Sequence, residues 1–262
     1  MSGEPQASQA VATAAQVKPR FAHIRPYEPR DRHAVRAICC RTAFRNLGAQ
    51  TLINDDELFA DYWSRYYTDF ESQSLFVAEQ EGQVVGYLFG CVNSRRFIRV
   101  MARRIVPIVV LHLLGKIILG RFRNAGSNRS TLKWFFLKSW REAPPLPVED
   151  FPAHYHCNLL PEAYQQNLYT RLALHFLDYL EAHGVTMIHG QLLEPKAGGV
   201  HHRILEKYSA AHPQWIRFVS EKPTDFGREV VGVETEFVNR AYGFTVADYR
   251  LFLQWMAKRY RL

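Results

Sequence analysis

Cysteine is scarce in this chain of 262 residues, which contains four: Cys39, Cys40, Cys91 and Cys157. Adjacent cysteines are poor disulfide partners, because the bond needs a larger separation of their Cα atoms. No cysteine pair has the spacing of a metal site, and the adjacent His201 and His202 lack a third ligand at useful spacing. We therefore expect no metal and no disulfide framework, and a reducing cytoplasm is the simplest location.

Export and membrane-spanning signals are also missing. Residues 1–20 have neither a basic beginning nor a continuous apolar run, and their Ala, Gln and Ser content predicts a disordered tail. The most apolar stretch, 105–119, is too short for a membrane span and contains Pro107 and Lys116. Hydrophobic residues make up 47% of the chain, which is ordinary for a globular protein, so we expect residues 21–262 to form a single domain.

Acidic residues are missing from one long segment. Between Arg95 and Arg141 the sequence has twelve Lys or Arg and no Asp or Glu. The net charge of the whole chain is +8, so removing these twelve charges leaves −4 for the rest. The basic character therefore belongs to this segment and not to the remainder of the chain.

The stretch 152–194 carries the clearest secondary-structure pattern. Residues 154–160 and 186–193 are predicted strands, and an amphipathic helix over 162–183 lies between them. Four apolar residues spaced four apart indicate the helix: Leu168, Leu172, Phe176 and Leu180. Gly184 follows at the position where helices end. The first turn of such a helix presents unpaired backbone N–H groups, which together with the helix dipole favour a bound anion.

The same stretch resembles the cofactor-binding core of the GNAT superfamily of acetyltransferases. In that family a strand hydrogen-bonds the pantetheine of acetyl-CoA, and a turn of the form Gln/Arg-x-x-Gly-x-Gly/Ala wraps the pyrophosphate at the start of a helix. The corresponding turn here begins at Gln165, and the preceding NLLPEAYQ fits well. The residues that the resemblance places on acetyl-CoA are Asn158, Leu159, Leu160, Gln165, Gln166, Asn167, Leu168, Tyr169, Thr170 and Arg171.

The turn departs from the family pattern at two positions, where Leu168 and Thr170 replace glycines. Glycine lets the backbone approach a phosphate closely. We therefore expect the two larger side chains to narrow the anion site, while their N–H groups remain available. Two alternatives stay open: the turn still binds the cofactor, or it has lost that ability. If the turn is only narrowed, replacing both residues by Gly should tighten binding.

The rest of the chain follows the order of elements in the same family. The predicted elements are a strand (22–27), two helices (32–45 and 55–70), a hairpin (74–80 and 83–92), a helix (201–211), a strand (215–219) and a last strand (245–255). The resemblance covers 21–94 and 152–262. It implies an α/β (α+β) fold with a mixed, mostly antiparallel central sheet flanked by helices.

The segment 95–150 interrupts this order as a basic and apolar helical insertion. Three interpretations stay open. It is a helical cap packed on the domain, or an interfacial hairpin whose residues 97–140 contact an anionic membrane, or a site for an acidic acceptor, CoA phosphates or nucleic acid. No nucleic-acid-binding motif supports the last of these ligands, so nucleic acid is disfavoured.

The resemblance implies direct acetyl transfer from a thioester to an amine, without a covalent enzyme intermediate. An N–H group would polarise the thioester, a base would take a proton from the amine, and an acid would protonate the thiolate. His154 and His156 alternate with Tyr155, so their side chains face the same side of the strand. The candidate bases are His154, His156 and Glu79, and the candidate acids are Tyr242 and Tyr208. Structural roles for the histidines stay open, and Cys157 is expected to be a buried strand residue.

The function predicted from these observations is acetyl-CoA-dependent N-acetylation of a small-molecule or peptide amine. The alternative is a catalytically inactive, GNAT-like protein that binds acyl-CoA or associates with a membrane surface. The sequence carries no recognisable code for the acceptor.

Overall fold

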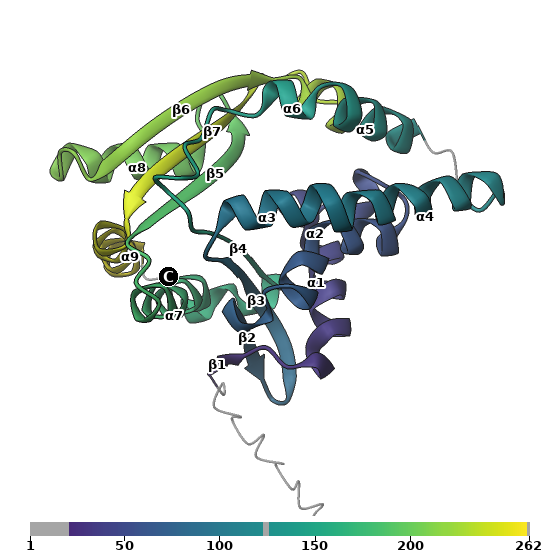
Figure 1. Cartoon of the computed structure of the whole chain (residues 1–262). Helices are drawn as coiled ribbons and strands as arrows, with labels where there is room; N and C mark the ends of the chain where they lie inside the picture. Colours follow the sequence, from purple (N-terminus) through teal and green to yellow (C-terminus); the bar gives the residue numbers. More distant parts are fainter. Residues whose placement is uncertain (1–20, 123–125, 261–262) are drawn as a thin grey trace, which may run out of the picture.

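Two antiparallel sheets organise the structure, which is a computed structural model describing residues 21–122 and 126–260 (Figure 1). The expected disordered tail, 1–20, lies outside these residues. The first sheet has four strands in the order β1-β2-β3-β4, and the second has three in the order β5-β7-β6. The two sheets meet at a single parallel bridge between Ala153 and Ile188, where the N–H of His189 donates to the carbonyl of Ala153 (2.8 Å).

The first sheet forms as the sequence predicts. Its strands are β1 (His23–Pro26), β2 (Leu75–Gln80), β3 (Gln83–Cys91) and β4 (His154–Leu159). The β2–β3 turn is Glu81-Gly82, and both residues have positive φ (51° and 77°), as a two-residue hairpin requires. Helices α1 (Arg32–Asn46) and α2 (Asp56–Asp69) pack on one face through a buried cluster that includes Tyr87 and Phe89.

Three helices in the C-terminal part of the chain connect the second sheet to the first. The strands of this sheet are β5 (Met187–Pro195), β6 (Ile216–Thr224) and β7 (Phe237–Thr245), and the helices are α7 (Leu168–Ala182), α8 (Val200–Ala211) and α9 (Val246–Tyr260). Helix α7 packs on the first sheet and on α9, and α9 packs on β7. These helices share one buried cluster with both sheets. Beyond the bridge at Ala153, side-chain packing in this cluster therefore holds the two sheets together.

Helix α7 is the predicted amphipathic helix. The apolar residues predicted at four-residue spacing are all fully buried, and a 3₁₀ turn (Pro161–Gln166) precedes the helix. Gly184 has φ 69°, the left-handed conformation that ends helices. Gly90 of β3 faces α7 so closely that an added Cβ would lie 2.3 Å from the Phe176 ring. This glycine lets the helix approach the sheet.

The predicted last strand over 245–255 is wrong, because these residues begin α9 instead. The buried residues Phe252, Leu253 and Met256 follow a helical spacing. Thr245 Oγ1 accepts a hydrogen bond from the N–H of Asp248 (3.0 Å), which is an N-capping contact that the Thr-x-x-Asp pattern could have revealed. The last strand is β7, and β6 extends beyond its predicted end at 219 to Thr224.

The segment between β3 and β4 is helical, as predicted for 105–119. It contains α3 (Ser94–Val100), a π-helical turn (Met101–Ile105), α4 (Val106–Ile118), α5 (Gly126–Leu137) and the short α6 (Ser139–Glu142). The far end of α4 extends beyond α1 and α2 at the right of Figure 1. Within 21–122 and 126–260 no helix combines the length and the apolarity needed to cross a membrane.

Candidate active site

The free edge of β4 is the first part of the site. β4 pairs with β3 along its other edge, and the N–H of Leu160 donates to the carbonyl of Val85 (2.9 Å). N–H groups of alternate residues in a strand point the same way, so the even-numbered residues of β4 are directed at β3. The N–H groups of Tyr155, Cys157 and Leu159 therefore point toward β5.

These N–H groups are not used by the second sheet. Beyond the bridge at Ala153 the described residues form no further ladder pair between β4 and β5. Gly190 of β5 adds no side chain here, and an added Cβ would meet no atom within 4 Å. A row of unpaired backbone donors is the arrangement that a ligand carbonyl can complete.

The first turn of α7 is the second part. Asn167 precedes it in the left-handed conformation (φ 53°). Asn167 Oδ1 and Thr170 Oγ1 are buried and have no hydrogen-bond partner among the described residues. Buried polar atoms without partners are rare, and the first N–H groups of a helix also lack intrahelical acceptors. Arg171 adds a guanidinium with no acidic partner in the described part of the chain. The N–H groups and the guanidinium are donors that fit a diphosphate, whereas the amide oxygen Asn167 Oδ1 can only accept a hydrogen bond.

The expected narrowing of this turn by side chains is wrong. Leu168 is 0% exposed and belongs to the core under α7, and Thr170 is only 2% exposed. Both side chains therefore point into the protein, because the helix places them on its buried face. The phosphate-facing surface of the turn is backbone at these two positions, although neither residue is glycine.

His154 is held by two neighbours. Ser94 Oγ donates its only hydrogen to the carbonyl of Pro152 (2.7 Å), so it accepts from Nδ1–H of His154 (2.7 Å). Nε2 then accepts from the hydroxyl of Tyr67 (3.2 Å). Burial, and the nearby His189, lower the pKa of His154 to about 3. Both ring nitrogens of this neutral imidazole are occupied, which leaves it no free atom for proton transfer.

His156 faces the same side of β4 as predicted but has a different environment. Its ring is exposed and has no hydrogen-bond partner among the described residues, and it stacks on Trp63 of α2 with ring centroids 6.5 Å apart. Partial desolvation by the surrounding protein lowers the pKa of His156 to about 4. At neutral pH the ring is therefore uncharged, with a free nitrogen lone pair beside the unpaired edge of β4.

Three tyrosine hydroxyls meet on the other face of β4. Tyr155 Oη lies 2.8 Å from Tyr169 Oη of α7 and 2.7 Å from Tyr249 Oη of α9. Burial raises the pKa of all three tyrosines, so they are protonated at neutral pH. Three hydroxyls joined by two hydrogen bonds leave one hydrogen free to be donated. Sequence analysis missed this tyrosine trio, because Tyr249 lies far along the chain in the segment predicted as a strand.

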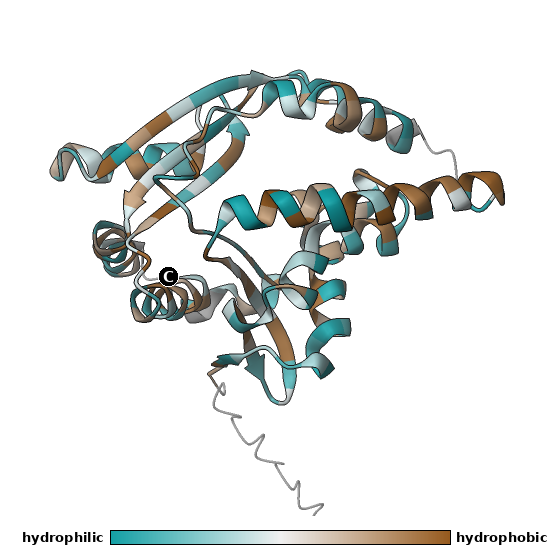
Figure 2. Ribbon diagram, in the orientation of Figure 1, coloured by the Kyte–Doolittle hydropathy of each residue, from teal (hydrophilic) through white to brown (hydrophobic). Residues whose placement is uncertain are grey.

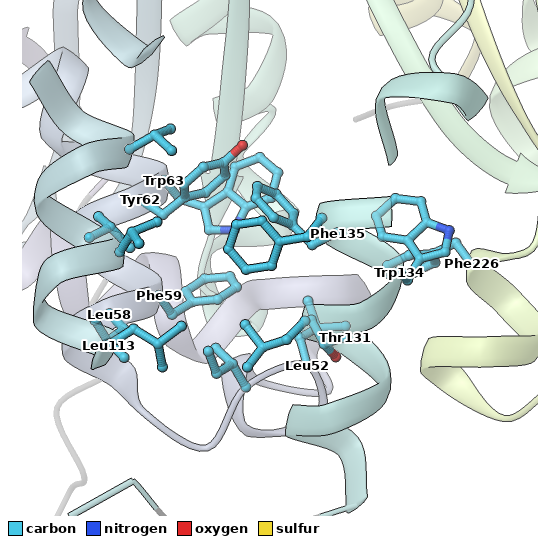
Figure 3. Close-up of a pocket in the computed structure, with 16 residues that line it drawn as sticks. Leu52, Leu58, Phe59, Tyr62, Trp63, Leu113, Thr131, Trp134, Phe135 and Phe226 are labelled. Atoms are coloured by element: carbon cyan, nitrogen blue, oxygen red, sulfur yellow. The ribbon is translucent and has the colours of Figure 1, made fainter. Parts of the chain in front are cut away.

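An apolar pocket lies between α2, α4 and α5 (Figure 3). Its volume is about 120 Å³, and a cavity of roughly 150 Å³ is enough to hold benzene in another protein. Trp63, Tyr62 and Phe135 line it, and the last two rings meet edge to face with centroids 5.0 Å apart. Because Trp63 also stacks on His156, the pocket and that imidazole share one wall.

The other predicted site residues are placed elsewhere. Glu79 forms an ion pair with Arg25 at the outer part of the first sheet, and its ladder partner Val84 is five residues from the partner of His156. Tyr208 packs inside the aromatic cluster of α8 and α9. Tyr242 lies on β7, beyond β5, and its hydroxyl pairs with Nδ1 of His202 (2.8 Å). The structure does not bring these three residues to the edge of β4.

The predicted cofactor residues fall into two groups: those whose polar groups are free for a ligand, and those whose polar groups already bond within the protein. Leu159 directs its N–H to the open edge, whereas Leu160 uses its N–H on Val85 and cannot offer it. Asn158 directs its side chain to the Tyr87 hydroxyl (2.9 Å) on the α1 side. Gln165 and Gln166 end the 3₁₀ turn before α7.

Cys157 lies on β4, as predicted. Burial raises the pKa of its thiol above the usual range, so the thiol stays protonated at neutral pH and is not a nucleophile.

Comparison with known proteins gives a structural match over most of the chain. The solved structure titled SsHAT shares 22% sequence identity with this chain at a TM-score of 0.58, and the match covers 87% of this chain and 99% of that one. The chain has the GNAT fold. The mixed α/β architecture with antiparallel sheets is therefore confirmed.

Two further solved structures are more distant in sequence and structure. One is yncA from Salmonella typhimurium with its cofactor acetyl-CoA (11% identity, TM-score 0.41, covering 87% of this chain and 95% of that one). The other is the GNAT superfamily phosphinothricin acetyltransferase from Sinorhizobium meliloti in complex with acetyl-CoA (13%, TM-score 0.43, 86% and 89%). No family model and no curated protein matches the chain.

Proposed function

We propose that this GNAT-fold protein is an acetyl-CoA-dependent N-acetyltransferase whose acceptor amine carries an apolar group. The observation that carries the proposal is the position of His156. Its neutral, exposed imidazole lies on the strand whose N–H groups are unpaired, and that strand leads into the open first turn of α7. A base, a row of backbone donors and an anion site thus follow one another along 155–171.

The residues that would hold acetyl-CoA are those with unused polar atoms. Arg171 and the first N–H groups of α7 are suited to its diphosphate. The N–H groups of Cys157 and Leu159 are suited to its pantetheine and thioester carbonyl. When bound, acetyl-CoA supplies an acetyl group that is activated as a thioester.

The chain's own groups supply the proton transfers. His156 accepts the proton that the acceptor nitrogen loses, because its free lone pair is on the side of β4 that faces α2 and the pocket. The tyrosine trio, on the opposite side of the same strand, would donate a hydrogen to the CoA thiolate that leaves when the new C–N bond forms and the C–S bond breaks. The base, His156, and the acid, the tyrosine trio, are therefore separated by β4.

The apolar pocket accounts for the acceptor part of the proposal. Aliphatic and aromatic side chains line it, and its shared wall with His156 is the Trp63 ring. A ring or short alkyl group in the pocket would direct an attached amine toward the imidazole. Thr131 lines the same pocket, and its buried hydroxyl has no partner among the described residues, so it can contact one polar group of the acceptor.

Replacing Thr170 by Val tests whether backbone or side chain forms the anion site at this position. The substitution keeps the shape of a buried side chain and removes its unpaired hydroxyl. We expect the Kd for acetyl-CoA to stay unchanged, because the hydroxyl points into the protein and the turn offers the phosphates its backbone N–H groups. The free energy of unfolding should stay equal or rise by up to about 1 kcal/mol, since an orphan polar group is removed. Calorimetric titration and denaturant unfolding measure the two quantities. A Kd that rises about tenfold, the loss of a hydrogen bond to a charged group, would show that the hydroxyl contacts the phosphates.

An amine panel tests the acceptor class. We expect kcat/KM for phenethylamine to exceed that for ethanolamine about tenfold or more, which is the discrimination that a small apolar pocket provides. Val109→Asp, which places a carboxylate on the pocket wall, should remove this preference, whereas Val219→Asp on the exposed face of β6 should not. Equal rates for both amines in the unsubstituted protein would reject the pocket. Binding of acetyl-CoA without turnover of any amine would favour the inactive, acyl-CoA-binding alternative.

A further inference from the structure

The outward face of α4 is apolar in its middle and basic at both ends. Exposed residues recur at intervals of three and four from the preceding π-helical turn through α4, so they form one stripe: Arg104 of the turn, and Pro107, Leu111, Leu114 and Ile118 of α4. Leu111, Leu114 and Ile118 are 65%, 48% and 83% exposed. Figure 2 shows the far end of α4 as hydrophobic. We call this row of five residues the α4 stripe.

The opposite face of the same helix is anchored to the protein. Ile105 and Leu113 are buried there, and Nζ of Lys116 pairs with Oδ2 of Asp55 at 2.5 Å. These contacts fix the rotation of α4 about its axis. The exposure of the α4 stripe is therefore a consequence of how the helix is held.

Cations flank the stripe in the sequence and have no carboxylate partners. Arg99, Arg103 and Arg121, like Arg104 of the stripe itself, are exposed and form no ion pair within the described residues. A second group on the returning helices has the same composition, with exposed Phe136, Leu137 and Trp140 beside these cations: Arg129, Lys133 and Arg141. The Arg141 guanidinium lies 4.7 Å from the centre of the Trp140 ring.

We propose that the α4 stripe docks on an anionic lipid surface, with the helix lying in the headgroup region. Large apolar side chains flanked by arginines, together with a tryptophan, have the composition of interfacial helices. The charge complementarity argues for this occupant: a second copy would bring the same unpaired cations against each other, whereas anionic headgroups neutralise them. Nucleic acid would use the arginines but leave the leucines and isoleucine exposed. This inference does not depend on the proposed acetyl transfer.

Vesicle co-sedimentation of the full chain tests the proposal. We expect recovery with vesicles of phosphatidylglycerol and phosphatidylcholine, little recovery with phosphatidylcholine alone, and weakening in 0.5 M salt because the charges are screened. The double variant Leu111→Asp/Ile118→Asp should bind the anionic vesicles about tenfold or more weakly, since both apolar contacts are lost and two repelling charges are added. Leu251→Asp on α9, at a position of similar exposure (56%), is the matched control and should bind like the unsubstituted protein.

Three outcomes would overturn the proposal. These are equal recovery with neutral and anionic vesicles, no recovery with either, and unchanged recovery of the double variant. Sedimentation velocity of the protein alone gives a further check. If the unsubstituted protein is a dimer that does not bind lipid, and the double variant is a monomer, the α4 stripe is a self-association surface instead. Circular dichroism and thermal unfolding of both variants show that they fold, which is expected because the substituted side chains are exposed.

Discussion

Replacing His156 by Ala is expected to lower kcat for acetyl transfer roughly 10²–10⁴-fold, the range that a positioned general base contributes. The Kd for acetyl-CoA should not change, because the imidazole faces α2 and the pocket, away from α7. Steady-state rates with a saturating amine and calorimetric titration of acetyl-CoA measure the two effects. His175→Ala is the matched control, since this exposed histidine on α7 bonds only the carbonyl of its own helix at Arg171.

The pH profile of kcat distinguishes this role from a structural one. The pKa of His156 is lowered to about 4, so the basic form is present above that pH and lost below it. We expect the His156-dependent part of kcat to stay level from pH 8 to pH 5 and to fall as the pH approaches 4. A fall centred near 6.5, the ordinary histidine value, would mean that a histidine in an unperturbed environment is the base. If His156→Ala retains full activity, the proposed base is wrong.

Replacing Leu168 by Gly is expected to lower the free energy of unfolding by about 3 to 5 kcal/mol, because it empties a fully buried leucine site and introduces glycine into a helix. For a chain of this size such a loss lowers Tm by roughly 10 °C. The affinity for acetyl-CoA should not improve, since the leucine side chain points into the core and leaves the turn already open. Denaturant unfolding and acetyl-CoA titration of the same preparation measure both.

The matched control for this substitution is Leu251→Gly. Leu251 is also a leucine in a helix but is 56% exposed, so only the helix propensity of about 1 kcal/mol is lost. A Leu168→Gly variant that is as stable as this control, and that binds acetyl-CoA more tightly, would restore the original idea that the leucine narrows the turn. Thr170→Val changes one polar atom at the other position without opening a cavity. It therefore separates an effect on acetyl-CoA binding from an effect on the free energy of unfolding.

Local patterns in the sequence were sufficient for the first sheet and for α7. Each of these elements has a signal within a few residues: the Glu81-Gly82 turn, the leucine spacing before Gly184, and the Pro161 that ends β4. The fold class followed from the family resemblance, which rests on the order of these elements. The helix α9 was missed because aromatic and β-branched residues in TVADYRLFLQW favour a strand locally, while its burial against α7 and α8 decides the outcome.

The site itself was only partly predictable. The alternation of His154 and His156 placed both on one face of β4, but the sequence could not tell them apart. Their difference comes from Ser94 and Tyr67, which occupy both nitrogens of one ring and neither of the other. The tyrosine trio and the pocket likewise depend on contacts between α2, α4, α7 and α9 that no local pattern records.

The two ends of the segment between β3 and β4 are hydrogen-bonded to each other, and this bears on how the segment can vary. Both the N–H and the hydroxyl of Ser94 donate to the carbonyl of Pro152, at 2.8 and 2.7 Å, so the chain leaves and rejoins the sheet at one stapled point. The entropy of closing a loop rises only slowly with its length. Helices α3 to α6 can therefore be lengthened, shortened or replaced while β4 and its backbone N–H groups keep their register with β3. The walls of the acceptor pocket could then change in sequence and length while the groups on β4 that carry out the transfer stay in place.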